Sequence, residues 1–315
     1  MTSVAQTTST PSQSAPTQLD PAVEAAAFKR LYPRKYLSRF LEHDRRPDGR
    51  PTDSWREVGV NAGAVSTANG SALIRLGDTT VVCGIKAETA EPDWDRPNEG
   101  WLVPNVDLPA ISSPNFKPGP PVDEAQVFSQ QIYDLLISSN VLPLRKLGIR
   151  PGKSAWVLYI DIVCINYDGN AFDAAVLAVM TALRNTVLPV ATYDEDADQT
   201  ICSRTETRNL KDDLRSIPLA CTFGIFDNKY LLPDPSAFEL PLCPTTITIA
   251  IDSTDPTSSS KSKSKSTKAA EPRIRLVRQE GMGGYAGKAG IEVVGECIGA
   301  AKARVRELSE KLYGQ

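Results

Sequence analysis

The polar and apolar positions near the start of the chain predict two short helices behind a polar tail. Residues 1–19 are rich in Ser, Thr, Gln and Pro, a composition that buries too little apolar surface to fold, so we expect a disordered tail. Asp20 is a good N-cap and Pro21 suits the first helical position, so a helix should begin there. Pro33 interrupts it, and the run RKYLSRFLEH indicates a second helix. Residues 20–54 therefore form an N-terminal helical segment.

From Trp55 onward the apolar period changes to two, which is typical of strands. Three β-rich runs follow, namely REVGVNAG (56–63), SALIRLG (71–77) and TTVVCGIKAE (79–88). Gly77 and Asp78 suit a hairpin turn between the last two runs, so a meander of three strands is expected. Residues 89–123 contain eight prolines and no regular period, which indicates a long surface loop with some extended pieces.

The middle of the chain alternates helix and strand patterns. Apolar residues spaced along one helix face predict a helix over about 124–139; they are Ala125, Phe128, Ile132 and Leu135. Residues 154–165 are nearly all apolar or β-branched, so we expect a central strand covered on both faces. Residues 173–183 are apolar all round, as in a buried helix.

Strand patterns return after the polar stretch TYDEDADQT (192–200). They comprise ACTFGIF, the run KYLL after a turn at Asp227 and Asn228, the alternating run 246–251, and RIRLVRQE. Residues 253–270 hold four lysines and one aspartate and are expected to be a disordered insertion in a hairpin loop. The chain closes with a helix whose apolar residues recur every three or four positions: Ile291, Val294, Ile298, Ala301, Val305, Leu308 and Leu312.

This order of elements predicts an α+β protein with two comparable halves, residues 55–190 and 191–313, whose helices cover the sheets from one side. With 315 residues, 41% of them apolar, the chain is long enough to bury a core. The longest apolar run, 171–183, is too short to span a bilayer. The first 28 residues contain no Lys, Arg or apolar stretch, unlike a targeting peptide. We therefore expect a soluble intracellular protein with no membrane partner.

Charge and cysteine usage narrow the function classes. A net charge of −3 argues against a free-standing nucleic-acid binder, because such domains usually carry a strong basic excess. The six cysteines are scattered and fall mostly in apolar runs, so they are interpreted as buried thiols in a reducing compartment. No His/Cys cluster has metal-ligand spacing, so no metal site is indicated. The sole histidine, His43, ends a helix and is expected at the surface.

Several stretches together resemble one family, the RNase PH-like subunits of the eukaryotic RNA exosome ring. The resemblance runs from about residue 35 to 313. The stretches that carry it are RRPDGR (45–50), NGSALIRLGDTTVVCGIKAE (69–88), VPNVDLP (103–109), SAWVLYIDIVCINYDGNAFDAA (154–175) and FGIFDNKYLLPDP (223–235). It implies the RNase PH fold, which is ribosomal protein S5 domain 2-like, with two βαβ-type halves and helices packed on the sheets.

The resemblance also implies an assembly, a hexameric ring of such subunits around a channel that threads RNA. The implied partners are the other ring subunits, S1-domain cap proteins, an exosome-associated nuclease, and RNA in the channel. No cofactor is implied, and the implied locations are the nucleus, nucleolus and cytoplasm. In active members, inorganic phosphate attacks the terminal phosphodiester, which requires cationic and N–H groups on the phosphate and a carboxylate acting as acid.

The turn that opens the buried helix has lost the residues that hold phosphate in active members. Those members have Gly-Thr-Arg directly after Asp-Gly, whereas Asp168-Gly169 is followed here by Asn170, Ala171 and Phe172. A helix N-terminus favours an anion in general, but Ala and Phe donate no side-chain hydrogen bond. Asp168 and Asp173 would repel phosphate by roughly 1 to 4 kcal/mol each at contact distance, and Asp173 is expected to cap the helix dipole.

Two other parts of the implied site have also changed. The position of a second phosphate-binding arginine on the preceding helix aligns with Asp134, which reverses the charge. The Asp-rich catalytic segment aligns with LPDPSAFELP, in which Asp234 and Glu239 are retained but Leu240 replaces an expected acid. The simpler interpretations are a turn with a capping Asp168, a solvated or interface Asp134, and a turn at Asp234.

The sequence therefore predicts a non-catalytic structural subunit of the exosome ring, with a degenerate site. Within the loop FKPGPP, Lys117 matches a region that faces the channel in the family and is the candidate for RNA contact. The alternative is a phosphate-dependent 3′-to-5′ exoribonuclease whose divergent site uses Asp168 with Asp234. A third possibility is a stand-alone RNA-binding module, which the acidic balance disfavours.

Overall fold

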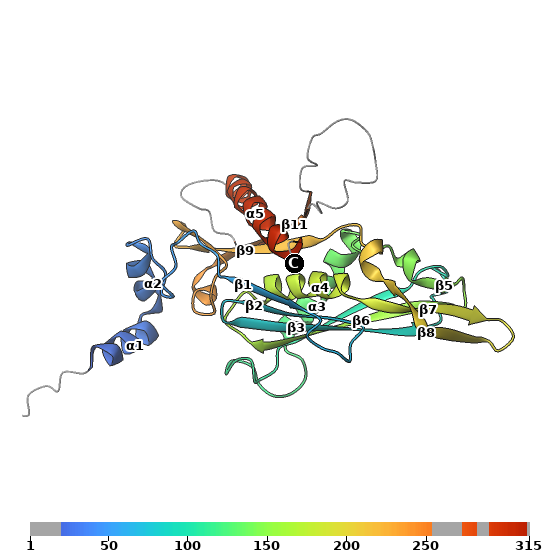
Figure 1. Ribbon diagram of the computed structural model, residues 1–315. Coiled ribbons are helices and arrows are strands. Elements are labelled where there is room, and N and C mark those ends of the chain that lie inside the picture. Colours follow the sequence, from blue (N-terminus) through green and yellow to red (C-terminus); the bar gives the residue numbers. More distant parts are fainter. Residues whose placement is uncertain (1–19, 254–272, 282–289, 314–315) are drawn as a thin grey trace, which may run out of the picture. The chain divides into compact units, whose positions relative to one another are not determined.

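The computed structural model describes residues 20–253, 273–281 and 290–313 (Figure 1). The first 49 residues form a unit of their own, with helices α1 (Pro21–Leu31) and α2 (Pro33–Leu41). The predicted cap of α1 is confirmed, because Asp20 Oδ1 accepts the Ala22 N–H at 3.3 Å. The predicted disordered tail 1–19, and all but the first residue of the predicted insertion 253–270, lie outside the described residues.

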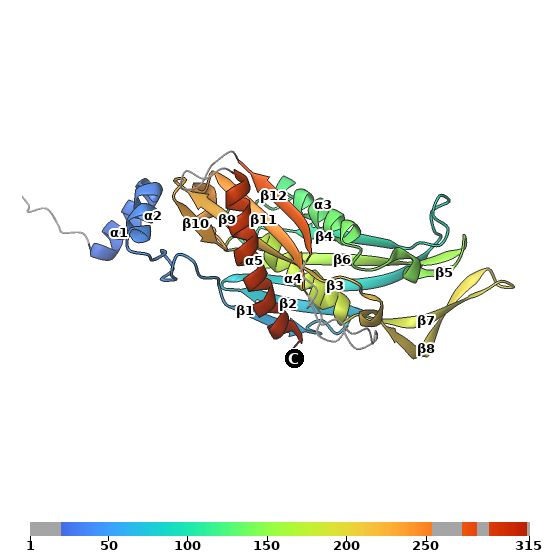
Figure 2. The same ribbon diagram turned by 90° about the horizontal axis from the view of Figure 1, so that it is seen from above.

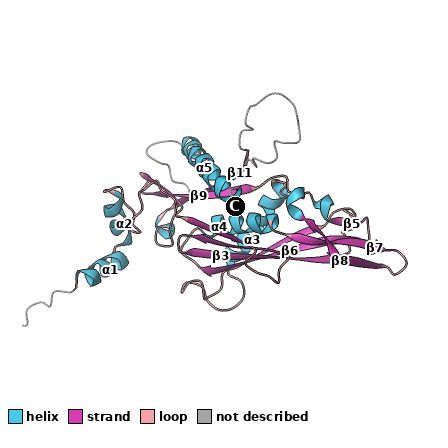
Figure 3. Ribbon diagram, viewed as in Figure 1, coloured by secondary structure: helices cyan, strands magenta, loops and turns pink. Residues whose placement is uncertain are grey.

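The second unit begins with a six-stranded sheet, ordered β1-β2-β3-β6-β4 with β5 beside β6. Figure 3 shows the strands in magenta and the helices in cyan. Its strands are β1 (Val58–Ala62), β2 (Gly70–Leu76), β3 (Thr79–Ala90), β4 (Trp101–Asp107), β5 (Gly148–Arg150) and β6 (Ser154–Asn166). The predicted β1–β2–β3 meander is antiparallel and confirmed. Strand β4 runs parallel to β6. Helix α3 (Asp123–Ser138) and the 3-10 turn η1 (Leu144–Leu147) lie between them in sequence.

Helix α4 (Ala171–Arg184) lies between the two large sheets of this unit, as Figure 1 shows. It contacts β2 and β3 on one side and β9 on the other. Every residue from Ala171 to Leu183 is buried, which confirms the prediction of a helix that is apolar all round. Because α4 is covered on both sides, Gly169 and Asn170 in the turn that opens it are buried as well, whereas Asp168 is half-buried.

A four-stranded sheet, ordered β10-β9-β11-β12, forms the other layer (Figure 2). Its strands are β9 (Pro218–Phe226), β10 (Tyr230–Pro233), β11 (Thr245–Asp252) and β12 (Ile274–Glu280), and η3 (Leu240–Leu242) precedes β11. Helix α5 (Gly290–Tyr313) packs on β9 and β11. All nine residues of β9 are buried because α4 and α5 both pack on this strand. Within the described ranges, no helix combines the length and apolar character needed to cross a bilayer.

The proline-rich segment 89–123 contains strand β4, which confirms the predicted extended pieces within this long loop. Val106 N–H donates to Ser129 Oγ at 2.8 Å, on the side away from β6. Pro104, two residues earlier, therefore also faces the free edge, where its missing N–H breaks no ladder bond. A proline-rich run can thus form a strand at a sheet edge.

The prediction that β6 is covered on both faces is confirmed only for its first part. Residues 154–158 are buried, but from Tyr159 onward one face is exposed and also carries Val163 and Ile165. The polar stretch 192–200 belongs largely to a two-stranded hairpin, β7 (Val187–Asp194) and β8 (Gln199–Asn209), which is followed by η2 (Leu210–Asp213). Apolar content alone did not show which strand faces meet another layer.

Two predictions of burial were also wrong. Ile291, assigned to the inner face of the last helix, is 88% exposed because it lies in the first turn of α5. Cys202 is exposed on β8, whereas the other five cysteines are buried, and all six are free thiols.

Candidate functional site

The turn between β6 and α4 has a backbone that only certain residues adopt. Gly169 has φ +77° and Asn170 has φ +49°, both in the left-handed region. A Cβ on Gly169 would lie 2.5 Å from the Ala237 backbone nitrogen, so the segment after β10 packs directly on the turn. Ala237 N–H also donates to the Asp168 carbonyl at 3.1 Å. Glycine is therefore required here by both conformation and close approach.

A buried arginine, Arg56, occupies the space beside this turn. Its Nε donates to Asp234 Oδ2 at 2.8 Å and its Nη2 to Asp234 Oδ1 at 2.7 Å, a two-point ion pair. The guanidinium also donates to the carbonyls of Asp168 at 2.8 Å and Gly169 at 3.2 Å. Burial opposes its charge, but the hydrogen bond and charge of Asp234 outweigh this, and the pKa of Arg56 is raised. The guanidinium of Arg56 is thus engaged in contacts within the protein.

Sequence reasoning missed Arg56, which lies within a run assigned to a strand. Thr79 completes the arrangement, because its hydroxyl donates to the Gly169 carbonyl at 2.8 Å and accepts the Asp168 N–H at 3.1 Å. The Asp168 carboxylate lies 3.5 Å from Arg56 Nη1 and its side chain is 40% exposed. A lone arginine flanked by strand residues carries no motif that would have identified it.

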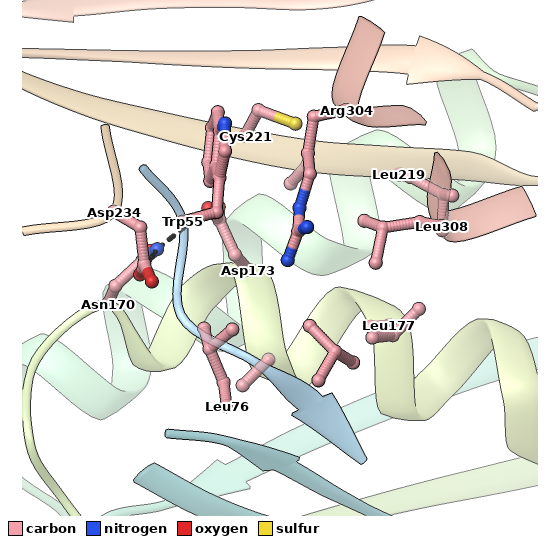
Figure 4. Close-up of a pocket in the computed structure, with 13 residues that line it drawn as sticks. Trp55, Leu76, Asn170, Asp173, Leu177, Leu219, Cys221, Asp234, Arg304 and Leu308 are labelled. Atoms are coloured by element: carbon pink, nitrogen blue, oxygen red, sulfur yellow. Dashed lines mark hydrogen bonds between the residues drawn. The ribbon is translucent and has the colours of Figure 1, made fainter. Parts of the chain in front are cut away.

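Asn170 joins two carboxylates on the other side of the turn (Figure 4). Its Nδ2 donates to Asp234 Oδ1 at 2.6 Å and to Asp173 Oδ2 at 2.8 Å. The two acceptors fix the orientation of the amide, because a flipped side chain would set an oxygen against two carboxylates. Its Oδ1 is buried with no hydrogen-bond partner among the described residues. Asn170 therefore serves the internal network, and as N-cap of α4 its side chain makes no capping bond.

Asp173 lies in the first turn of α4, where it was expected to cap the helix dipole, but its hydrogen bonds reach beyond the helix. It is buried, and it accepts the Thr222 backbone N–H at 2.7 Å and the Thr222 hydroxyl at 2.8 Å, both from β9. Burial raises its pKa to about 6, although the hydrogen bonds from Asn170 and Thr222 oppose that shift. The carboxylate thus links α4 to the smaller sheet, because a buried acid takes the donors within reach.

Asp234 shows the opposite shift. It is 0% exposed, at φ +51°, and burial alone would raise its pKa. The hydrogen bond and charge of Arg56, then Asn170 and Arg50, outweigh burial, so the pKa of Asp234 is lowered. Its contribution to stability is present above its ordinary pKa and is lost as the pH falls below it. Asp234 therefore acts as a structural anion.

A cavity of about 20 Å³ adjoins this network, lined by side chains that include Asp173, Leu177 and Arg304 (Figure 4). Arg304, from α5, donates to the Arg56 carbonyl at 2.9 Å, and its guanidinium carbon lies 5.4 Å from the Trp55 ring centre. Helix α5 therefore also holds the segment that carries Arg56.

On its other side, the start of α4 borders an open pocket of about 420 Å³ between α3 and the smaller sheet. Ala171, Phe172 and Leu240 line it, so the positions where the resemblance led us to look for polar groups form an apolar part of the wall. Phe172 packs against Phe128 with ring centres 5.8 Å apart.

The charged groups of this pocket are mainly acidic. Arg278 pairs with Glu280 across the strand end, and Glu124 lies opposite on α3. Burial raises the pKa of Glu124, a hydrogen bond from Tyr167 opposes the shift, and the charge of Glu280 adds to it. Two carboxylates against one paired arginine make this pocket unfavourable for phosphate.

The remaining predicted residues lie away from this pocket. Asp134 is exposed on α3, where it accepts a hydrogen bond from Gln130 at 2.9 Å, one turn beyond the last α3 residue that lines the pocket. Glu239 is buried and accepts the Ser236 N–H at 2.9 Å. Lys117 is exposed in the loop before α3, next to Phe116, whose ring packs on Tyr167. The structure thus brings together Asp168, Asn170 and Asp234 but not Asp134 or Lys117.

Comparisons with known proteins agree with this architecture. Residues 54–189 match a sequence family described as 3' exoribonuclease family, domain 1. The chain is 48% identical over 228 residues to Exosome complex component rrp43 of Schizosaccharomyces pombe, covering 72% of this chain and 83% of that protein. It is 37% identical over 223 residues to Exosome complex component Rrp42 of Archaeoglobus fulgidus, covering 70% and 81%.

Solved structures show the same fold. An Archaeoglobus fulgidus exosome chain, from a complex with RNA bound to the active site, superimposes with a TM-score of 0.71 at 29% identity. A chain of an archaeal exosome core superimposes with a TM-score of 0.67 at 27% identity. Each comparison covers 92% of this chain and 99% of the other.

Replacing Arg56 with methionine should destabilise the protein strongly. The change removes the two-point partner of buried Asp234, which keeps the longer contact with Arg50, at 3.6 Å, and the Asn170 amide. It also removes donors from two carbonyls, and the loss should be about 3 to 5 kcal/mol. The stability of Arg56→Lys should lie between those of the parent and Arg56→Met, because a lysine ammonium keeps the charge but cannot make the two-point contact. Arg75→Met is the matched control, since Arg75 pairs with Asp78 only at the surface, at 3.8 Å. Urea unfolding measures all three, and equal midpoints for Arg56→Met and Arg75→Met would refute the structural role.

Asp173→Asn should raise stability at neutral pH and alter the pH profile. The raised pKa of Asp173 means that the parent protein loses stability as the pH rises from about 4 to about 6. An asparagine keeps the network, because its oxygen can accept from Thr222 N–H and Asn170, while its amide donates to the Thr222 hydroxyl. That hydroxyl can in turn donate to Thr248 Oγ1, 3.1 Å away. The variant should not lose stability between pH 4 and pH 6, and its free energy of unfolding at pH 7 should exceed that of the parent by on the order of 2 kcal/mol.

Denaturation midpoints at pH 4, 5, 6 and 7 test this expectation. Asp134→Asn removes a negative charge from an exposed site on α3 and serves as control. A stability deficit of Asp173→Asn that grows as the pH rises would instead show that the carboxylate is needed in its charged form.

Proposed function

The chain belongs to the RNase PH-like family of exosome complex components, and from this premise we propose that it is a non-catalytic structural subunit of the exosome core ring. Two stretches, EPDWDRPNEGWLVPNVDLP and FKPGPPVDEAQVFSQQI, resemble one ring member, ribosomal RNA-processing protein 43 (exosome component 8). The 48% identity to a protein of that name confirms this resemblance. The proposed work is to hold neighbouring subunits, support an S1-domain cap protein and line part of the channel that delivers RNA to a nuclease.

One observation carries the non-catalytic assignment, the closed network around the β6–α4 turn. The cation nearest the turn, Arg56, is bonded to Asp234 and to two carbonyls. The pocket on the other side of the turn carries two carboxylates against one paired arginine. Phosphate would therefore find the arginine beside the turn already paired and the charges that line the pocket mainly negative, whereas its attack requires cationic groups.

The rival proposal is a phosphate-dependent exoribonuclease that uses Asp168 with Asp234. Asp234 is fully buried and its pKa is lowered by Arg56, so it does not hold a proton for a leaving group. Asp168 is accessible, but a single carboxylate beside a saturated arginine offers no site for the attacking anion. The geometry therefore favours the structural subunit.

The open face of the six-stranded sheet supports a role in subunit packing. Val103 and Tyr159 are neighbours across β4 and β6, and Val163 and Ile165 continue the same face; all four are exposed. An exposed apolar face of this kind marks an interaction surface. We assign it to a neighbouring exosome subunit, since stable ring contacts bury on the order of 2,000 Å² of surface.

Lys117 is proposed as a channel residue, supported by its exposure and by the anchoring of its neighbour Phe116. As a part of the exosome, the subunit is proposed to work in the nucleus, nucleolus and cytoplasm.

The purified chain, incubated with single-stranded RNA and inorganic phosphate, is expected to release no nucleoside diphosphate. The closed network leaves no place for the attacking phosphate, so turnover should match a reaction without protein. Asp168→Asn should behave as the parent does. Phosphate-dependent release that disappears in Asp168→Asn would instead establish the exoribonuclease.

Val163→Arg on the open sheet face is expected to reduce entry of the chain into a reconstituted exosome core without unfolding it. The charge would have to be desolvated at the contact, which costs affinity. Val187→Arg, at a similarly exposed valine on β7, is the matched control. Co-elution on size exclusion, with circular dichroism of each free variant, measures both effects. Normal co-elution of Val163→Arg would remove this face from the interface.

A further inference from the structure

Trp94 is an exposed tryptophan that the proposed function has not used. It lies in the loop 91–100 between β3 and β4, and 92% of its surface is exposed. Trp156, by contrast, is 6% exposed. Single exposed apolar residues are common, so exposure alone is no sign of a site. The shape and the charge of the loop make Trp94 different.

The loop holds Trp94 in a fixed position. Arg96 N–H donates to the Asp93 carbonyl at 3.0 Å, which closes a turn with Trp94 at its tip. Two backbone hydrogen bonds tie the base of the loop to other segments. Gly152 N–H donates to the Pro97 carbonyl at 2.8 Å, and Gly100 N–H donates to the Leu144 carbonyl at 3.1 Å. A side chain presented by such a loop loses little freedom on binding, which favours affinity.

The surroundings of Trp94 are acidic. Glu91, Asp93 and Asp95 are exposed, and none of them forms a salt bridge with another described residue. The loop arginine, Arg96, lies 3.9 Å from Glu99 and so is partly neutralised. Three exposed carboxylates that form no salt bridge with another described residue therefore lie within three positions of one protruding indole.

We propose that Trp94 is a docking anchor that inserts into an apolar pocket, ringed by Lys and Arg, on another subunit of the exosome core. This inference rests on the proposed function for the identity of the assembly. An indole can also stack on RNA bases, but three carboxylates repel the phosphate backbone and exclude that ligand. Tryptophan is among the residues that most often dominate an interface, and the acidic rim selects a basic partner.

Fluorine NMR of the full chain tests the inference. The chain is labelled with 5-fluorotryptophan, the Trp94 signal is assigned by its loss in Trp94→Phe, and the unlabelled remaining core subunits are added. On assembly the Trp94 signal should shift and lose its response to a soluble paramagnetic probe. A Trp94 signal that stays fully accessible within the assembled core would overturn the inference and leave the proposed function intact.

Affinity measurements provide the second readout. Trp94→Ala should weaken binding to the remaining core subunits by about tenfold or more. Ile111→Ala is the matched control, because Ile111 is 83% exposed in the loop after β4 and is expected to change binding less than twofold. Equal binding by Trp94→Ala and the parent chain would contradict the anchor.

Charge is tested separately. The double variant Asp93→Lys, Asp95→Lys should associate more slowly, because two lysines repel a basic partner. Added salt should slow association of the parent chain but speed association of the variant. A Trp94 signal that responds to a single-stranded RNA oligonucleotide but not to the core subunits would overturn the inference in favour of RNA. Failure of the parent chain to join the core would overturn both proposals.

Discussion

The buried ion pair between Arg56 and Asp234 is the contact on which the rest of this structure depends. It connects the segment before β1, the turn before α4 and the segment after β10, which lie far apart in the sequence. A buried charge is tolerated only when its hydrogen bonds are satisfied, and here Asn170 and the two turn carbonyls satisfy them. The left-handed backbone at Asp234 and the absence of a side chain at Gly169 follow from the same close packing.

This contact also shows how the arginine beside the turn is used within the fold that this chain shares with exosome chains. A charged group cannot both saturate a buried partner and bind a ligand, because its donors are limited in number. Arg56 is used inside the molecule, and the outer wall of the turn is Ala171 and Phe172. The exposed residues discussed above are apolar or aromatic. They are the side chains on the open face of β6 and the indole of Trp94. Both suit contact with protein.

Sequence patterns predicted the regular elements well where one rule applied. The meander β1–β3, the helices α3 and α4, and the turn at Asp227 and Asn228 all lie where periodicity and turn residues indicated. Predictions were incomplete where two rules competed. Proline indicated a loop with extended pieces but did not show that one piece is the edge strand β4, and apolar content indicated two buried faces for β6, which holds only for residues 154–158. At the site, the resemblance drew attention to Asn170, Ala171 and Phe172, but Arg56 carried no motif.

The sequence by itself determined the fold class, the buried helix and the replacement of polar groups by Ala171 and Phe172, because these depend on local periodicity and on residue identity. Only the tertiary structure decided the charge states and partners of the site. Asp173 and Asp234 are the same residue type, yet burial raises the pKa of one and Arg56 lowers that of the other. Such differences arise from neighbours brought together across long separations in the chain, which no local pattern encodes.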